Sequence, residues 1–359
     1  MTPFIRRSGL LVWFVGMLSL LQGCTTPQHQ STPPAPDITL NEAGRHDLAV
    51  HALKTVTLPT LKRWQAATQA LTDASRQQCQ RPTPDVSTLQ AAFEVLYPAW
   101  YRAMLYDFGP LRDNLFFPRI HFVDSMRQRG KDYHDTIVTT FETALNASEP
   151  LNEAYFDQLK FTQVGLPAIE VMLYEPRFVS ALATHPRACQ LLVGLTQHQR
   201  RLADSILTQW QSSEETAPQS NYLQQLVKNQ LPDGETALSK LLFSLQDYLR
   251  YLNQRQINGH LDATLSDLTR ANLLAGLNEV ETLLTAGDSG AGLIDYARKA
   301  GHTELAQTLM QTLDQARQAT EALDREAMRS SYYTLMKQLE RPLPEAMGVN
   351  LGMNFTDGD

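Results

Sequence analysis

The sequence predicts an all-α protein made of two helical-bundle halves. Apolar residues recur at helical spacing along most of the 359-residue chain, and no segment alternates apolar and polar residues as a strand would. Short polar segments rich in proline and glycine separate these periodic stretches. A chain of this length also exceeds what one hydrophobic core usually serves, so two units are expected.

The N-terminus has the pattern of a bacterial lipoprotein signal. Arg6 and Arg7 precede an apolar run of 12 residues, Leu10 to Leu21, which is too short for a bilayer span of about 20 residues. Leu21-Gln22-Gly23-Cys24 then resembles a lipobox. The resemblance implies removal of residues 1–23 and lipid on Cys24. The alternative is an ordinary secretory signal with a chance cysteine.

The residue after that cysteine indicates to which membrane the lipoprotein is sorted. Thr25 stands there rather than Asp, which in typical lipoprotein sorting implies the periplasmic face of the outer membrane of a Gram-negative bacterium. Residues 24–45 are predicted to form the lipidated cysteine and a flexible tether, because residues 25–37 contain four prolines and no large apolar residue. The lipid anchor would then make the membrane a partner of the protein.

The charge of the chain excludes one class of partner. The formal net charge is -7 at pH 7, and loss of Arg6 and Arg7 with the signal would make it -9 (-7 - 2). The 31 Lys and Arg residues are scattered and form no basic stripe. Nucleic acid is therefore not expected to bind.

Two cysteines remain beside Cys24. Cys79 and Cys189 are an even pair in a compartment that oxidises thiols, so we predict a disulfide that closes a loop of about 110 residues in the N-terminal half. A redox or metal-binding pair is the alternative, although the cysteines lack CxxC spacing and an adjacent histidine.

Helices are predicted wherever the apolar period is sustained, and breakers mark their ends. Residues 80–86, Gly109-Pro110, 212–220 and 288–292 are such breakers. Residues 212–220 are the expected domain boundary, which gives an N-terminal bundle at 46–211 and a C-terminal bundle at 212–359. The predicted helical stretches are 61–71, 89–104, 189–210, 238–252, 265–283 and an unbroken 302–340.

The segment from Gly165 to Tyr174 carries the central motif. Gly165 and Pro167 should end one helix and begin another, because proline is tolerated in a first turn. Glu170 would then lie near the positive end of that helix. The carboxylate could be a ligand, or simply an acid that stabilises the helix start.

This motif and several others resemble those of the imelysin-like family of periplasmic proteins. The family hallmark is Gly-x-His-x-x-Glu. In the branch of predicted lipoproteins, the same segment has the sequence Gly-Leu-Pro-Ala-Leu-Glu. The resemblance implies an all-α fold of two halves, a groove between them near the motif, and a role in iron acquisition. Supporting segments are Cys79, Trp100, Phe108-Gly109-Pro110, Arg119-Ile120-His121-Phe122, Cys189 and residues 351–359.

The residues do not support the peptidase activity for which the family was named. Pro167 occupies the histidine position and can neither ligate metal nor carry a proton. The chain contains no HExxH, so a zinc peptidase site is not expected. Gly287-Asp288-Ser289-Gly290 resembles the nucleophile tetrad of trypsin-like proteases, but between helical stretches it is predicted to be a glycine-rich connection.

The candidate ligand-binding residues combine acids, aromatic rings and one arginine, with no catalytic residue among them. The structural alternatives are a satisfied lone histidine, aromatic core packing and a solvated terminus. Arg119 would balance an anionic ligand group, and the terminal acids could help to hold a cation. The set is Glu170, Arg119, His121, Trp100, Tyr101, Asp357 and Asp359.

The predicted function is a non-catalytic, outer-membrane-anchored periplasmic lipoprotein. It would bind iron, haem or an iron-linked ligand, or couple that cargo to other components of iron uptake; no cofactor beyond such a ligand is predicted. A protein-interaction scaffold at the outer membrane is the alternative, and a metallopeptidase is a poorer third.

Overall fold

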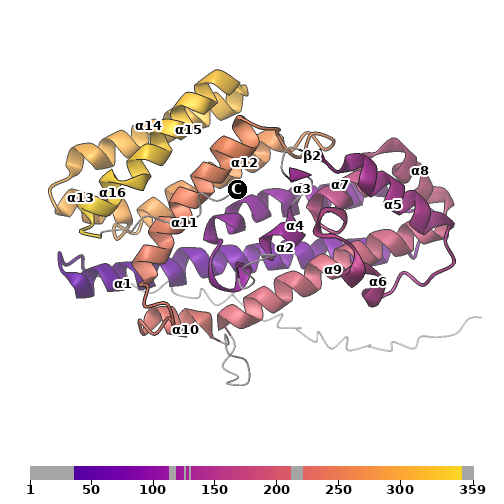
Figure 1. The fold of residues 1–359 in the computed structure, drawn as a ribbon, viewed down its shortest axis with the longest axis horizontal. Coiled ribbons are helices and arrows are strands. Elements are labelled where there is room, and N and C mark those ends of the chain that lie inside the picture. Colours follow the sequence, from indigo (N-terminus) through magenta and orange to yellow (C-terminus); the bar gives the residue numbers. More distant parts are fainter. Residues whose placement is uncertain (1–35, 113–118, 125–126, 129–130, 212–220, 350–359) are drawn as a thin grey trace, which may run out of the picture. The chain divides into compact units, whose positions relative to one another are not determined.

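The structure is a computed structural model that describes residues 36–112, 119–124, 127–128, 131–211 and 221–349 (Figure 1). Among these residues, no helix is both long and apolar enough to cross a membrane. Several predictions fall outside the described residues. They are the signal peptide 1–23, the lipidation site Cys24, most of the tether, the boundary 212–220, and the acids Asp357 and Asp359.

The chain begins with a long helical stretch and its antiparallel neighbour. The side chain of Asn41 caps α1 (Glu42–Ala52), which continues through a π-helical turn, η1 (Leu53–Thr57), into α2 (Leu58–Gln78). The side chain of Asp85 caps α3 (Val86–Ala103). Between α2 and α3 lie the prolines of residues 80–86, so the chain turns where the sequence predicts a break.

Short elements lead from α3 to the longest helix. In order they are η2 (Met104–Tyr106), η3 (Gly109–Leu111), α4 (Ile120–Val123), β1 (Arg127–Gln128), β2 (Lys131–Asp132), α5 (His134–Asn146), α6 (Glu153–Gln158), η4 (Phe161–Gln163), α7 (Leu166–Tyr174), α8 (Pro176–Thr184) and α9 (Pro186–Gln211).

The remaining elements are almost all α-helical. They are α10 (Tyr222–Val227), α11 (Ala237–Tyr251), the π-helical η5 (Leu252–Ile257), α12 (Thr269–Thr285), α13 (Leu293–Lys299), α14 (Thr303–Ala322), α15 (Arg325–Glu340) and α16 (Pro342–Ala346). The all-α prediction is confirmed, because the described strands amount to one antiparallel hairpin of two residues on each side.

One predicted helical stretch is interrupted. Residues 302–340 were expected to be unbroken, but Leu323 adopts a left-handed conformation with φ 51° and separates α14 from α15. Asp324 then caps α15 by accepting hydrogen bonds from the amides of Glu326 and Ala327. The break therefore comes from an N-cap acid, a weaker signal than the proline or glycine that marks the other ends.

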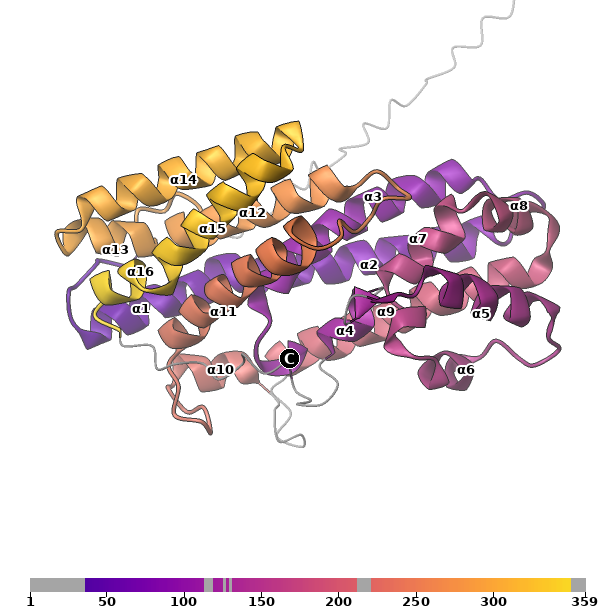
Figure 2. The same ribbon diagram turned by 45° about the horizontal axis from the view of Figure 1, so that its top comes forward.

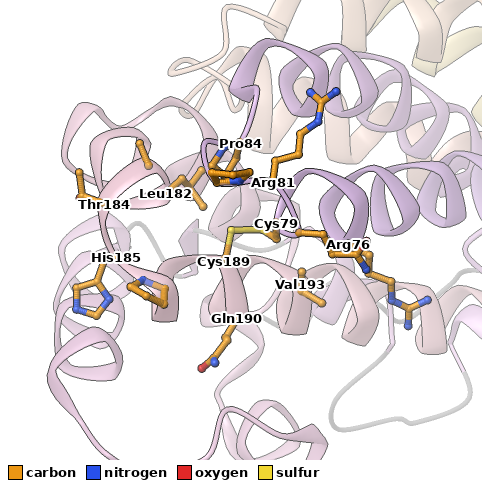
Figure 3. Close-up of a pocket in the computed structure, with 14 residues that line it drawn as sticks. Arg76, Cys79, Arg81, Pro84, Leu182, Thr184, His185, Cys189, Gln190 and Val193 are labelled. Atoms are coloured by element: carbon orange, nitrogen blue, oxygen red, sulfur yellow. A yellow bond between two sulfur atoms is a disulfide. The ribbon is translucent and has the colours of Figure 1, made fainter.

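The predicted disulfide is confirmed. Cys79 at the end of α2 and Cys189 in α9 are bonded, with an S–S distance of 2.19 Å and a Cα–Cα distance of 5.5 Å. Figure 3 shows the bond between the two helices, where it lines a surface depression. It thus fixes the end of α2 to the start of α9 within the N-terminal half.

The core is continuous across both predicted halves. Helix α2 packs against α3 and α9, and α3 also packs against α12 (Figure 2). Helix α1 contacts α11, while α12 and α11 are covered by α14 and α15. Inside, the rings of Trp64 and Trp100 lie 5.1 Å apart. Segments that precede and follow residues 212–220 are therefore in direct contact, and the residues that form the candidate site come from both.

Candidate functional site

A close approach of two backbones sets the position of α7. A Cβ atom on Gly165 would lie 2.7 Å from the carbonyl oxygen of Val123, so only glycine fits at this position. The side chain of Gln199 holds the same junction, because its amide donates to the carbonyls of Phe122 (2.8 Å) and Val164 (2.9 Å). The glycine of the motif therefore brings α7 against the end of α4.

Glu170 is buried and reaches across to the C-terminal half. Its side chain is 1% exposed. It accepts hydrogen bonds from the backbone amide (2.8 Å) and hydroxyl (2.6 Å) of Ser266, which lies between η5 and α12. Burial raises the pKa of Glu170, and the bonds from Ser266 partly oppose that rise. This environment differs from that of a surface acid that only stabilises the start of its own helix.

A second buried carboxylate follows α4. Asp124 is 6% exposed and accepts hydrogen bonds from the phenol of Tyr97 and the indole of Trp100, both at 3.2 Å. Burial, and then the neighbouring carboxylate of Asp262, hold the pKa of Asp124 well above its ordinary value. Glu170 acts in the same direction. Asp124 therefore keeps its proton at a higher pH than an exposed aspartate does.

Asp262 completes a group that we call the acidic cluster: Asp124, Glu170 and Asp262. Its side chain is partly exposed, and it accepts a hydrogen bond from the amide of Gln256 in η5. The charge of Asp262 raises the pKa of both other carboxylates. The three acids come from distant parts of the sequence, and Glu170 reaches the segment that carries Asp262 through its hydrogen bonds from Ser266.

Buried phenols border the acidic cluster. Tyr97 and Tyr101 pack with their ring centroids 5.9 Å apart. Burial raises the pKa of each phenol well above its usual range, and the charges of Asp124 and Asp262 add to this effect. Both side chains therefore remain neutral hydrogen-bonding groups at physiological pH.

A cavity of about 130 Å³ adjoins the cluster at Asp124. One oxygen of Asp107 on its wall, Oδ1, is buried without a hydrogen-bond partner. The other, Oδ2, pairs with Arg112 at 2.5 Å, while Asp247 lies 4.0 Å from the same guanidinium. Acids thus outnumber the arginine around the cavity. The lining residues are Met104, Asp107, Arg112, Ile120, His121, Asp124, Asp247, Tyr248 and Tyr251.

The structure gathers some of the predicted residues and separates others. Trp100 donates a hydrogen bond to Asp124, and Tyr101 is one of the two phenols that border the acidic cluster. His121 is exposed on the cavity wall, and its ring lies 6.0 Å from that of Phe161. Arg119 instead donates to the hydroxyl of Ser205 in α9, at 3.3 Å. Its predicted role beside Glu170 stays a prediction, and Asp357 and Asp359 lie outside the described residues.

Most of the acids at this site are not identified by any pattern in the sequence. Asp124, Asp262, Asp107 and Asp247 belong to no recognised motif and come from four separate segments. One usable signal is the position of Asp124 two residues after Arg119-Ile120-His121-Phe122, a segment that carries part of the family resemblance. The others become neighbours only through the packing of α3, α7 and α11 with the loop before α12.

The geometry limits what the site can bind directly. Within the described ranges, no three His, Cys, Asp or Glu side chains converge closely enough to hold a bare metal ion. The available donors are carboxylate and phenol oxygens and one imidazole, a set that suits a hard cation still carrying water. The arrangement can bind a cation and can hold protons on its buried carboxylates.

Comparisons with known proteins agree with this fold. The sequence model of the imelysin family, labelled Peptidase_M75, matches residues 57–346. No curated protein matches the chain. An imelysin-like protein from Psychrobacter arcticum 273-4 superposes with a TM-score of 0.71 at 16% identity, covering 89% of this chain and 99% of its own.

A second solved structure has the same fold. It is named a "putative iron-regulated protein A precursor" and comes from Parabacteroides distasonis ATCC 8503. It superposes with a TM-score of 0.65 at 12% identity, covering 88% of this chain and 97% of its own. The family match extends over more than half of the sequence and includes Gly165, Glu170 and most of the acidic residues described above. The chain therefore belongs to the imelysin family.

Proposed function

We propose that this protein is a periplasmic binding protein, anchored to the outer membrane by lipid on Cys24, that holds a small hydrated iron cation at the acidic cluster and its cavity. One observation carries the proposal. Asp124 and Glu170 are 6% and 1% exposed. Burial and neighbouring carboxylates raise the pKa of each side chain, and hydrogen bonds from neutral donors lower it.

Electrostatics favour a cation at such a site. A buried carboxylate is costly in its charged form, and a neighbouring carboxylate increases that cost. A cation in the adjoining cavity would favour ionisation of Asp124 and offset its repulsion from Asp262. It would also face the buried Oδ1 of Asp107, which lacks a hydrogen-bond partner.

The size of the cavity narrows the choice of cargo. Pockets that enclose drug-sized ligands usually measure about 300–1,000 Å³, whereas this cavity measures about 130 Å³. A haem does not fit in that volume, but a metal ion with a few waters does. Waters would complete the coordination, because the described acids do not by themselves converge as a ligand set.

The acidic site would bind its cargo without transforming it. Pro167 stands where the family motif has histidine, so Glu170 has no partner at that position to ligate metal or transfer a proton. A role in iron uptake agrees with the name of the Parabacteroides distasonis relative. The lipobox and Thr25 support the proposed location.

Metal titration tests the proposal. Purified protein without its signal would be titrated anaerobically with ferrous ion while tryptophan fluorescence is recorded, because Trp100 bonds directly to Asp124. We expect saturation at one ion per chain, with weaker binding in Asp124→Asn and no change in Glu304→Gln, an exposed acid of α14. No saturable signal at millimolar iron would refute direct binding of the cation.

A further inference from the structure

A serine and a histidine that are 238 positions apart in sequence meet at the opposite end of α12 from the acidic cluster. The Nε2 atom of His51, in α1, lies 3.3 Å from the hydroxyl oxygen of Ser289, in the connection between α12 and α13. His51 is 7% exposed, whereas Ser289 is exposed. The hydroxyl of Ser289 thus faces solvent while the imidazole in contact with it is shielded.

The connection that carries Ser289 has an unusual backbone. Ala286, Gly287, Asp288 and Gly290 all have positive φ values, of 48°, 65°, 62° and 76°. Ala286 is the left-handed C-cap of α12, a conformation that alanine rarely adopts and that glycine and aspartate tolerate better. The segment is a glycine-rich helix connection, as the sequence predicts, but its conformation holds the serine beside a buried imidazole.

One further contact orients the hydroxyl of Ser289. The backbone amide of Ala291 donates to the Ser289 oxygen at 3.3 Å, which leaves the hydroxyl hydrogen free to point at His51. Burial lowers the pKa of His51, so its imidazole is neutral at neutral pH and able to accept that proton. Gly290, the residue after Ser289, borders an open depression of about 640 Å³.

We propose that Ser289 and His51 form a nucleophilic pair that reacts with short carboxylic esters, as a second centre separate from the acidic site. The Ser289 oxygen attacks the ester carbonyl carbon and passes its proton to His51 Nε2. The bond to the alkoxy group breaks, and that group leaves as the alcohol with the proton from His51. Water, activated by the same imidazole, then releases the acid and restores the serine.

A fluorophosphonate probe tests the pair directly, because it marks a nucleophilic serine covalently. The serine oxygen forms a bond to phosphorus, fluoride leaves, and the proton goes to His51. Peptide mass spectrometry of the labelled protein should locate one adduct per chain at Ser289, and Ser289→Ala should abolish it. Ser330→Ala, which removes an exposed serine of α15, is the matched control and should label normally.

The rate of labelling measures the contribution of His51. His51→Gln should slow labelling by roughly 100-fold, the lower range for a general base, and hydrolysis of p-nitrophenyl acetate should fall in parallel. If His51→Gln does not fold, the pH dependence of labelling in the unaltered protein tests whether His51 acts as the base. The rate should rise with pH through a single group whose pKa lies below the usual value of a histidine, because burial lowers the pKa of His51. No adduct at Ser289, or a rate that rises only in the alkaline range where free hydroxyls ionise, would overturn the proposal.

Discussion

Two buried regions of this protein each contain a carboxylate, and their surroundings differ. Glu279 of α12 is fully buried and accepts hydrogen bonds from Thr60 and Tyr106, both at 2.7 Å, while Arg102 lies 3.5 Å from its other oxygen. Asp124, by contrast, accepts hydrogen bonds from the neutral side chains of Tyr97 and Trp100, and the charges that act most on its pKa are those of other carboxylates.

The difference separates a structural acid from a candidate binding acid. Glu279 links α2, α3, η2 and α12: its Oε1 accepts both hydrogen bonds, and its Oε2, which accepts none, faces the guanidinium of Arg102. The carboxylate therefore has a cation of its own within the fold. Asp124 lies beside a cavity and is repelled by Asp262. Burial alone therefore does not identify a functional carboxylate, whereas burial together with like charge and adjoining space does.

The largest expected effect is on stability, at Glu279. Glu279→Ala would leave the hydroxyls of Thr60 and Tyr106 without their acceptor and Arg102 without its partner. We expect the free energy of unfolding to fall by about 3 kcal/mol, as for other broken buried pairs. Urea unfolding followed by circular dichroism would measure it. A change below about 0.5 kcal/mol would mean that this network is not structural.

The next effect is on binding, at Asp124. Asp124→Asn keeps the side-chain shape and removes the charge, so ferrous ion should bind at least tenfold more weakly, equivalent to about 1.4 kcal/mol. Because the mutation also removes repulsion from Asp262, the free energy of unfolding should be unchanged or higher. Calorimetric titration and urea unfolding of the same preparation would test both. A large loss of stability would place Asp124 in the same class as Glu279.

The pH dependence of stability has a defined sign. The pKa of Asp124 is raised in the folded protein, so its contribution to stability is fully present below the unfolded value of about 4 and is lost as the pH rises through the folded pKa. Relative to the unaltered protein, Asp124→Asn should gain stability across that window, with a slope of up to about 1.4 kcal/mol per pH unit.

Unfolding at several pH values, in the presence of a chelator, would measure that gain. Glu304→Gln, at an exposed position of α14, is the control for loss of a surface acid. If the Asp124→Asn difference did not change with pH, Asp124 would bind protons equally in the folded and unfolded states, and its pKa would not be raised by folding.

The smallest effect is expected at His121. Its side chain is exposed on the cavity wall and packs loosely against Phe161. His121→Ala should weaken ferrous binding by a factor of about two to five, or roughly 0.4–1 kcal/mol. A loss as large as that of Asp124→Asn would make this imidazole a direct ligand.

Local patterns in the sequence predicted the helices and the disulfide well. Apolar periodicity and proline breakers are properties of neighbouring residues, so the end of α2 and the start of α3 could be read directly. The division at Leu323 was not predicted, because a leucine in a left-handed conformation has no compositional signature. Cys79 and Cys189 were predictable because only two cysteines remained after Cys24.

The candidate site was predictable only where a motif contained it. Glu170 was found through its glycine-proline segment, and Trp100 through its helix. Asp124 and Asp262 were missed because their proximity depends on how α4, α7 and the loop before α12 pack together, which no local spacing reveals. The pairing of His51 with Ser289 was missed for the same reason.

The most direct test of the binding account compares ferrous affinity in three proteins: the unaltered chain, the Asp124→Asn/Glu170→Gln double variant, and Glu279→Gln. All three would be titrated at the same pH after circular dichroism confirms that they are folded. We predict that the double variant loses about 30-fold or more in affinity, equivalent to about 2 kcal/mol, while Glu279→Gln stays within twofold of the unaltered chain. Equal affinity in the double variant and the unaltered chain would contradict a cation site at the acidic cluster.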